Sequence, residues 1–193
     1  MNEYKIPYKV FENIISITAA KIAEGKIIGW FSGKMEFGPR ALGSRSILAD
    51  PRKPEMKDIL NEKIKLRESF RPFAPMVLDE YANQFFELQD ANYDTMMITA
   101  QVKPGAEAMM PAVIHQDGTA RIQLVSKESN ADIYQLLKAF HPVYVQHVNV
   151  HPVVPPVQET VCAPVAGDKR YKISTLFPAA SVLEPKDVIA VPP

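Results

Sequence analysis

Apolar residues recur at helical spacing in three stretches of the chain, and this spacing predicts amphipathic helices. The stretches are residues 11–26, 54–65 and 130–141, and residues 79–88 also have a helical pattern. Gly25 is a candidate C-cap for the first helix, Pro54 suits the first turn of the second, and Asn130 is a candidate N-cap for the last. The sequence therefore predicts four helices with several of their ends marked.

Short apolar runs between these helices predict strands. They are residues 26–31, the second half of 67–78 and residues 95–102. Residues 112–125 predict a β-hairpin, because two apolar stretches flank Asp117 and Gly118, a pair that favours the positive φ angles of a tight turn. Since strands and helices alternate along the chain, the sequence predicts an α/β (α+β) fold.

The character of the chain changes after His141, because nine of its 17 prolines follow that residue. Proline cannot donate to a sheet ladder, so we expect residues 142–193 to form edge strands or an appendage, and residues 1–141 to form the main part of the domain. His147 and His151 raise the question of a metal site. The pattern around them predicts an extended segment broken by proline and not a helix, which argues against a metal there.

Composition limits the classes of protein to which the chain can belong. Of its 193 residues 47% are apolar and 23% are charged, which is typical of one folded domain. The formal net charge is zero, so nothing draws the whole molecule to nucleic acid or anionic lipid. We expect no membrane span and no secretory signal, and hence a cytoplasmic location. A single cysteine, Cys162, excludes an internal disulfide.

Positive charge is nevertheless concentrated in one region. Residues 34–71 hold ten basic and six acidic side chains, a net charge of +4 that the rest of the chain balances. So local an excess suits a small anion better than a nucleic acid.

The loop that follows the first predicted strand, residues 35–52, has a composition suited to binding an anion. Gly38 and Gly43 would let backbone N–H groups approach a ligand, while the guanidinium groups of Arg40 and Arg45 match a phosphate or carboxylate. A structural loop, with Glu36 and Asp50 paired to the arginines, fits the same residues. Both interpretations remain open at this point.

A second basic cluster comprises Lys63, Lys65, Arg67 and Arg71. If the chain is extended here, Lys65 and Arg67 project to the same side and could hold a di- or triphosphate. Alternatively, the cluster is a solvated helix end whose cations lie near the negative pole of the helix.

Three longer motifs resemble the C-terminal domain of the nodulation and antibiotic-biosynthesis O-carbamoyltransferases. They are GWFSGKMEFGPRALGSRSILADPR, MKDILNEKIKLRESFRPFAP and PAVIHQDGTARIQLVS. The resemblance extends from about Ile22 to Phe140. It implies a YrdC-like fold, in which helices pack on an open, twisted, mixed sheet.

The resemblance also implies a chemistry. Such a domain binds carbamoyl phosphate and ATP, with Mg²⁺ accompanying the nucleotide. Carbamoyl phosphate is cleaved to carbamate and phosphate, and the carbamate attacks the α-phosphorus of ATP to give carbamoyl-adenylate and pyrophosphate. The carbamoyl group then passes to a hydroxyl acceptor in a separate N-terminal, metal-binding transferase domain, which we expect in cis or in trans.

These substrates are polyanions, so positioning and charge neutralisation would carry most of the catalysis. The resemblance implies phosphate contacts for Lys65 and Arg67, with Arg71 as support. The other candidate phosphate-binding residues are Arg40, Arg45, Ser46, Thr119 and Arg121. His115 is the candidate general base, although a hydrogen-bonded strand histidine fits the same position.

Beyond residue 140 the sequence departs from the family pattern. Where the resemblance predicts a strand and turn of the form GxPxLLNTSFN, the chain reads HPVYVQHVNVHPVVPPV. Two functions are therefore compared: an O-carbamoyltransferase domain, and a non-catalytic YrdC-like module that binds a partner protein or RNA through its basic groove.

Overall fold

The computed structural model of the chain describes residues 10–145 and 172–173, and the side chains of residues 10–140. The helices in these residues are α1 (Ile14–Ala23), α2 (Met56–Ile59), its π-helical continuation η2 (Leu60–Lys65), α3 (Asp79–Phe85), the 3-10 helices η3 (Glu107–Met109) and η4 (Pro111–Val113), and α4 (Ala131–Val145). The strands are β1 (Ile28–Phe31), β2 (Arg45–Leu48), β3 (Met76–Leu78), β4 (Phe86–Glu87), β5 (Ala100–Val102), β6 (Thr119–Ala120), β7 (Gln123–Val125) and β8 (Lys172–Ile173).

These strands form three short sheets. In the first, β1 lies between β2 and β8 and is antiparallel to both, with Phe31 opposite Arg45 in the β1–β2 ladder. The second is the parallel pair β3–β7, and the third is the antiparallel set β4–β5–β6. The predicted α/β class is confirmed, with parallel and antiparallel pairs spread over three small sheets instead of one open sheet.

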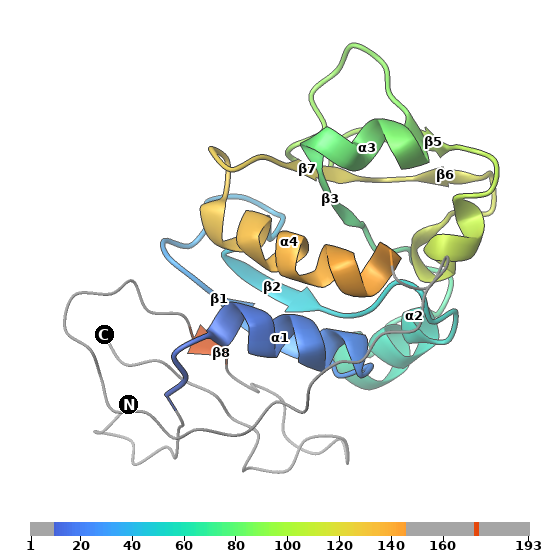
Figure 1. Cartoon of the computed structure of the whole chain (residues 1–193). Helices are drawn as coiled ribbons and strands as arrows, with labels where there is room; N and C mark the ends of the chain where they lie inside the picture. The colour runs from blue at the N-terminus through green and yellow to red at the C-terminus, as the bar shows by residue number, and fades with distance from the viewer. Residues whose placement is uncertain (1–9, 146–171, 174–193) are drawn as a thin grey trace.

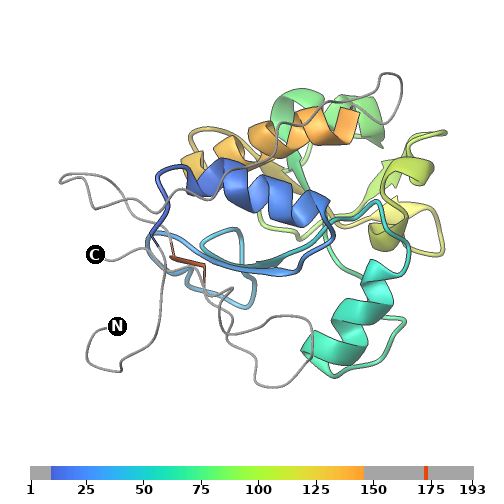
Figure 2. The same cartoon turned by 60° about the horizontal axis from the view of Figure 1, so that its bottom comes forward.

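A first hydrophobic core lies where α1 and α4 cover the β1–β2 ribbon. The two helices run side by side over the ribbon in both cartoon views (Figures 1 and 2). Trp30 from β1 is 1% exposed and packs in one cluster with Ile22 of α1 and Ile133 of α4. This core holds β1 and β2 in place, and with them both ends of the loop that joins the two strands.

A second core lies under α3 and the β4–β5–β6 sheet, at the upper right of Figure 1. Phe86, Tyr93 and Ile122 are fully or almost fully buried in it. The turn that carries His115 joins this second core. The parallel pair β3–β7 connects the two cores, because Val125 of β7 packs in the first and Val77 of β3 against the second.

All four predicted helices are present, although the one predicted over residues 79–88 ends at Phe85 and is followed by β4. Two of the three predicted end signals are confirmed, whereas Pro54 lies before the N-cap Glu55 and not in the first turn. The N–H of Gly25, which has φ +87°, donates to the carbonyl of Ile22 at 2.8 Å, as a C-cap glycine should. The Asn130 side-chain oxygen accepts from the N–H of Ile133 at 3.1 Å. The helix predicted over residues 54–65 is present as α2 and η2.

Two strand predictions and one loop prediction are partly wrong. Residues 112–125 do not form a hairpin, because η4 replaces the first arm and β6 and β7 pair with β5 and β3 instead of with each other. The strand predicted over residues 95–102 is limited to β5, and the end of the predicted loop 35–52 forms β2. In each case a partner distant in sequence decided the pairing, which a local pattern does not reveal.

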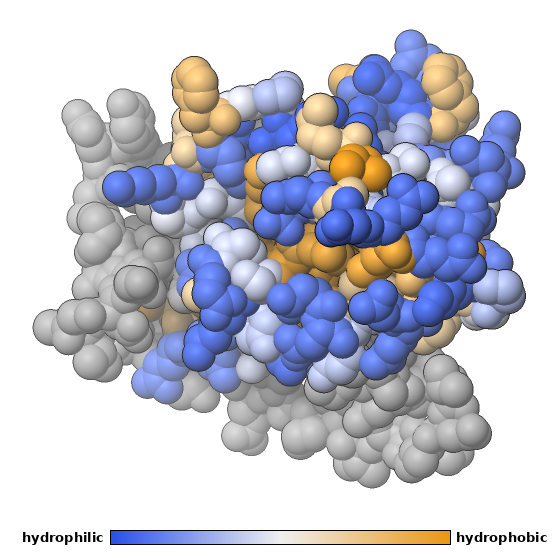
Figure 3. Space-filling view, turned by 90° about the horizontal axis from the view of Figure 1, so that it is seen from above, coloured by the Kyte–Doolittle hydropathy of each residue, from blue (hydrophilic) through white to orange (hydrophobic). Residues whose placement is uncertain are grey.

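Most of the proline-rich segment, including His147 and His151, lies outside the described residues. The described part shows α4 continuing past His141 to Val145, and β8 as an edge strand on β1. None of the helices in the described ranges has the length and hydrophobicity needed to cross a membrane. Seen from above, the surface is largely hydrophilic, with hydrophobic atoms in a central hollow and at a few protruding points (Figure 3).

Candidate functional site

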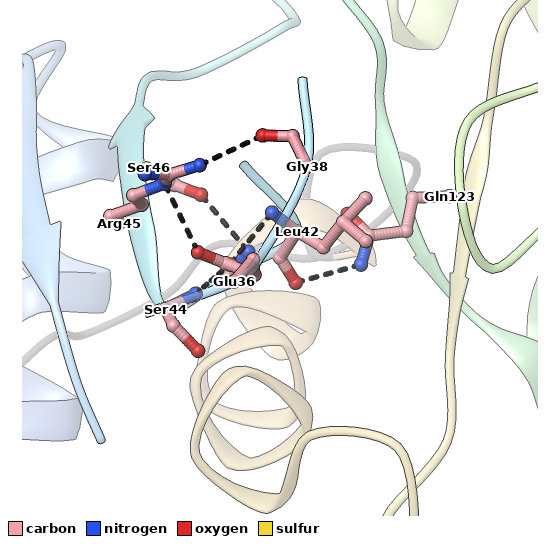
Figure 4. Close-up of polar contacts among 8 residues, drawn as sticks. Glu36, Gly38, Leu42, Ser44, Arg45, Ser46 and Gln123 are labelled. Atoms are coloured by element: carbon pink, nitrogen blue, oxygen red, sulfur yellow. Dashed lines mark hydrogen bonds and ion pairs between the residues drawn. The ribbon is translucent and has the colours of Figure 1, made fainter. Parts of the chain in front are cut away.

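The loop between β1 and β2 is organised around a single carboxylate, that of Glu36 (Figure 4). Its Oε1 accepts the N–H of Leu42 at 2.8 Å and the N–H of Ser44 at 2.6 Å. Its Oε2 lies 3.5 Å from Nε of Arg45, whose Nη2 donates to the carbonyl of Gly38 at 3.1 Å. Burial alone would raise the pKa of Glu36, but these N–H groups and Arg45 outweigh it and hold the pKa below its usual value.

Two residues predicted to bind phosphate, Arg45 and Ser46, have structural contacts inside this loop. Arg45 is paired with Glu36, and the buried Oγ of Ser46 accepts the N–H of Gly43 at 3.0 Å. Similarly, Arg52 is paired with the buried carboxylate of Asp50. For these residues the structure favours the structural interpretation of the loop over direct phosphate contact.

A different set of arginines meets near the loop, and we call it the arginine cluster: Arg40, Arg67, Arg71 and Arg121. Burial, followed by repulsion from Arg71 and Arg121, lowers the pKa of Arg67. Burial, followed by repulsion from Arg40, lowers the pKa of Arg121. Guanidinium groups stay charged in proteins, so the depressed pKa values report like charges crowded together in a partly desolvated place.

Few carboxylates compensate this charge. Within residues 10–140 the one ion pair of the cluster joins Arg71 to Glu68 at 3.8 Å, on the exposed surface. Arg40 instead contacts the sulfur of Met97 at 2.8 Å, and the buried Nε–H of Arg121 has no acceptor in the described part of the chain. Crowded cations with a single exposed carboxylate partner among the described residues are a typical arrangement for binding an external anion.

Asn61 positions the second basic segment. It is fully buried in η2, and its amide nitrogen donates to the carbonyls of Ser69 (3.1 Å) and Arg71 (2.9 Å). Its Oδ1 accepts from Nε of Arg67 at 2.8 Å, and the guanidinium carbon of Arg67 stands 4.8 Å from the centre of the Phe73 ring. The π-helical turn thus places a polar side chain inward, where it holds Arg67 in one orientation.

The predicted pairing of Lys65 with Arg67 does not have the geometry assumed for it. Lys65 is exposed at the last residue of η2, and Leu66 follows with φ +47° in the left-handed region. The N–H of Arg67 then donates to the carbonyl of Asn61 at 3.0 Å. Because the chain is turned here and not extended, the same-side argument is wrong. Arg67 belongs to the cluster, whereas Lys65 stands at its solvent side.

His115 and Thr119 lie together at the Asp117–Gly118 turn. Nδ1 of His115 is 3.0 Å from Oγ1 of Thr119, whose hydroxyl is also 2.7 Å from Oδ1 of Asp117. Thr119 opens β6, and Arg121 follows two residues later on the same face of the chain, since Ala120 and Ile122 between and after them are fully buried. Thr119, which holds His115, is thus two residues from Arg121 of the arginine cluster.

The main cavity in the described residues lies elsewhere. It measures about 210 Å³ and is lined by apolar side chains from α1, α2, β3 and α4, among them Ile22, Met56 and Leu136. Asp50 and Lys57 are its only charged lining residues, and none of the predicted phosphate-binding residues reaches it. A polyanion needs hydrogen-bond donors, so we place the candidate site at the arginine cluster and not in this cavity.

The described residues do not fit a protein-held divalent metal. Nowhere among residues 10–145 and 172–173 do three or more His, Cys, Asp or Glu side chains gather as ligands. Near the arginine cluster, Glu36 and Asp117 already accept hydrogen bonds from neighbouring N–H and hydroxyl groups. Magnesium bound by the oxygens of a nucleotide is compatible with this part of the chain.

Sequence reasoning missed two contributors to the site. Asn61 stands among charged and apolar residues of the helix over residues 54–65, between Leu60 and Glu62, and no local signal distinguishes it from a solvated helix position. Gln123, whose Nε2 donates to the carbonyl of Leu42 at 2.8 Å, ties the loop to β7 across 81 residues of sequence. Nothing local marks that contact.

Fold and site together define an α/β domain that presents a crowded cluster of arginines beside a histidine turn. The chain belongs to the carbamoyltransferase C-terminus family, whose model matches residues 19–150. It is 43% identical over 160 residues to nodulation protein NolNO of Sinorhizobium fredii, covering 78% of this chain and 24% of that protein.

Two further relatives match the same region. Nodulation protein NolO of Bradyrhizobium diazoefficiens is 47% identical over 131 residues, 67% of this chain and 24% of the relative. Nodulation protein U of Sinorhizobium fredii is 45% identical over 123 residues, 64% of this chain and 22% of the relative. The chain thus spans about a quarter of the length of the curated relatives it matches.

Proposed function

We propose that this chain is the carbamoyl phosphate- and ATP-binding domain of an O-carbamoyltransferase, and that the arginine cluster binds the phosphate groups. The domain forms carbamoyl-adenylate, which a separate N-terminal transferase domain uses to carbamoylate a hydroxyl acceptor. Membership of the carbamoyltransferase C-terminus family supports the reaction class. The arginine cluster supports the substrate class.

The atoms of the proposed reaction balance in three steps. Water cleaves carbamoyl phosphate to carbamate and inorganic phosphate. A carbamate oxygen then displaces pyrophosphate from the α-phosphorus of ATP, and finally the acceptor oxygen displaces AMP from the carbamoyl carbon and loses its proton. Every step gathers or releases negative charge on phosphate oxygens, so preorganised guanidinium groups would stabilise the transition states.

The observation that carries the proposal is the crowding of positive charge in the cluster. Arg71 and Arg121 repel Arg67, and Arg40 repels Arg121, while the exposed Glu68 is the one carboxylate that pairs with the cluster among residues 10–140. A bound phosphate would accept from several guanidinium groups at once and relieve the repulsion. Arg67, held by Asn61 and Phe73, is preorganised for such a contact.

The surface around the cluster supports a partner domain. Large apolar side chains are exposed next to the arginines in sequence, namely Phe37, Leu66 and Phe70, and the exposed Met97 contacts Arg40. Phe37 is fully exposed, and exposed large apolar side chains are typical of an interaction surface. We propose that the part of the relatives' length that this chain does not span docks here.

The proposal is tested by ligand-induced thermal stabilisation of the full chain. We expect millimolar carbamoyl phosphate, and separately ATP with magnesium, to raise the midpoint of thermal unfolding. Arg40→Ala removes one cation whose only contact among the described residues is Met97, and should abolish most of the shift without unfolding the domain. Arg67→Ala should abolish it as well.

Lys127→Ala is the matched control, because Lys127 is exposed in a turn away from the cluster. It should leave the ligand shift as in the wild type. If neither ligand shifts the midpoint of the wild-type chain, the proposed function is wrong for this chain. If Lys127→Ala removes the shift as effectively as Arg40→Ala, binding is a general effect of charge and not of the cluster.

A further inference from the structure

The turn formed by residues 115–119, which we call the histidine turn, holds the side chain of His115 in one orientation. The N–H of His115 donates to the carbonyl of Thr119 at 2.8 Å, and the N–H of Gly118, with φ +78°, donates back to the carbonyl of His115 at 3.1 Å. These two bonds close a tight turn and hold the imidazole against the Thr119 hydroxyl. The ring is therefore fixed in place without help from a ligand.

Hydrogen bonds in this turn also fix the tautomer of His115. The carboxylate of Asp117 accepts both the hydroxyl of Thr119 at 2.7 Å and its N–H at 3.0 Å, and these bonds, the hydroxyl first, hold the pKa of Asp117 below its usual value. Since the hydroxyl proton is used for the carboxylate, Oγ1 of Thr119 accepts from His115. The proton of the neutral imidazole then sits on Nδ1, and Nε2 carries a lone pair.

That lone pair has no donor in the described part of the chain. Nε2 of His115 is buried from solvent and makes no hydrogen bond there. A buried acceptor without a partner is unfavourable, and such atoms in native proteins call for an explanation such as an external ligand. The second buried orphan on this face is a donor, the Nε–H of Arg121.

Donor and acceptor together match one chemical group. Thr119, which holds the imidazole, and Arg121 are two residues apart with the buried Ala120 between them, so we infer from strand alternation that the two side chains leave the chain on the same side. A carbamoyl group offers a carbonyl oxygen that accepts and, beside it, an amino group that donates. The dianionic phosphoryl group of an acyl phosphate, in contrast, offers only acceptors.

We propose that Nε2 of His115 accepts an N–H of the carbamoyl amino group and thereby selects carbamoyl phosphate over acyl phosphates that lack this N–H. The Asp117–Thr119 pair acts as a positioning relay, because it keeps the lone pair on the correct nitrogen. This inference rests on the proposed function, and it assigns to His115 a role in substrate selection.

The test compares three probes on the full chain by calorimetric titration: freshly dissolved carbamoyl phosphate, acetyl phosphate and inorganic phosphate. Acetyl phosphate has a methyl group in place of the amino group and is otherwise similar in shape. We expect the wild type to bind carbamoyl phosphate about tenfold more tightly than acetyl phosphate, the range of one well-placed hydrogen bond. His115→Leu should lose this preference and bind acetyl phosphate as the wild type does.

Two further variants separate recognition from structure. Thr119→Val is isosteric and removes the hydroxyl that fixes the tautomer, so it should reduce the preference even if His115→Leu fails to fold. His115→Gln keeps an acceptor oxygen and should restore part of the preference. Circular dichroism of each variant establishes that it is folded.

The possible failures can be told apart. Equal affinity of the wild type for the two acyl phosphates, or an unchanged preference in His115→Leu and Thr119→Val, overturns the role of His115 and leaves the phosphate site standing. Absence of binding of all three probes to the wild type overturns the proposed function and this inference with it.

Discussion

Arg121 belongs to the arginine cluster and lies in unfavourable surroundings. Its replacement should therefore weaken ligand binding and at the same time stabilise the unliganded chain. Its Nε–H is buried without an acceptor in the described residues, and Arg40 repels it. We expect Arg121→Met, which keeps the packing and removes the charge, to unfold at a temperature a few degrees higher, since about 1 kcal/mol shifts a chain of this size by roughly 2–4 °C. The same variant should lose the shift induced by carbamoyl phosphate.

Differential scanning calorimetry with and without ligand measures both effects in one experiment. Lys127→Met is the control for a generic gain from replacing a cation by a long apolar side chain. A lower unfolding temperature of Arg121→Met would mean that the guanidinium stabilises the unliganded fold, and the uncompensated charge would then be no sign of a site.

Glu36 gives a second prediction at the residue scale, a dependence of stability on pH. Its side chain is 14% exposed, and its pKa in the folded chain is below the unfolded value of about 4.3. A depressed carboxylate pKa contributes stability that is present above the unfolded pKa and is lost as the pH falls through the folded pKa. Glu36→Gln should therefore be less stable than the wild type by roughly 1–3 kcal/mol at pH 7, from hydrogen bonds to a charged group.

Urea denaturation at pH 7 and near pH 3 checks this prediction. The difference between wild type and Glu36→Gln should shrink at the lower pH, because the stability that the lowered pKa of Glu36 contributes is lost progressively as the pH falls below the unfolded pKa toward the folded one. Glu128→Gln, at an exposed position, should show no such convergence. If the two proteins differed in stability by the same amount at both pH values, the lower stability of Glu36→Gln would come from packing and not from the charge of Glu36.

At the scale of elements, the β1–β2 loop depends on one glycine. Gly43 has φ +114°, and a Cβ there would lie 2.7 Å from Cγ1 of Ile133 and 2.8 Å from Nδ2 of Asn130. Gly43→Ala is therefore both strained and in collision with α4, and we expect it to lower the free energy of unfolding by more than about 1 kcal/mol. Because the loop would shift, the ligand-induced stabilisation should fall with it.

Gly33→Ala provides the comparison within the same loop. Gly33 also has a positive φ, +65°, but nothing lies within 4 Å of a Cβ built on it. Its substitution should cost only the backbone term, about 1 kcal/mol, and should leave ligand binding intact. Chemical denaturation of both variants ranks the two costs, and equal losses would show that contact with α4 has no influence.

Elements defined by local periodicity could be predicted from the sequence, whereas elements defined by a distant partner could not. The helices α1 and α4 carry their own apolar faces and caps, and both were predicted. In contrast, β7 pairs in parallel with β3, whose Met76 lies opposite Gln123, 47 residues later in the chain. The Asp117–Gly118 turn signal had suggested a local partner for this strand instead. In the candidate site too, the residue types could be predicted from the sequence but their distant contacts could not.

Within the site, residue type identified the arginines but not their contacts. Arg40, Arg67 and Arg121 were named from composition and resemblance, and the structure brings them together. Arg45 and Ser46 belong to the same motif, yet their contacts lie inside the loop. Which arginine pairs with Glu36 depends on the β1–β2 register, and no spacing in the sequence reveals it.

At the scale of the whole molecule, zero net charge combined with a local cluster of arginines favours small phosphorylated anions over an extended polyanion such as RNA. A single-stranded RNA that contacted four arginines would lose affinity with a log–log salt slope of about −3. The rest of this chain balances the charge of residues 34–71 and offers such a polymer no extended attraction. We therefore expect no saturable retention of RNA in filter binding at 150 mM salt, while carbamoyl phosphate still stabilises the chain at that salt concentration. Retention of RNA with a steep slope, lost in Arg40→Ala and not in Lys127→Ala, would favour the non-catalytic RNA-binding module over the enzyme domain.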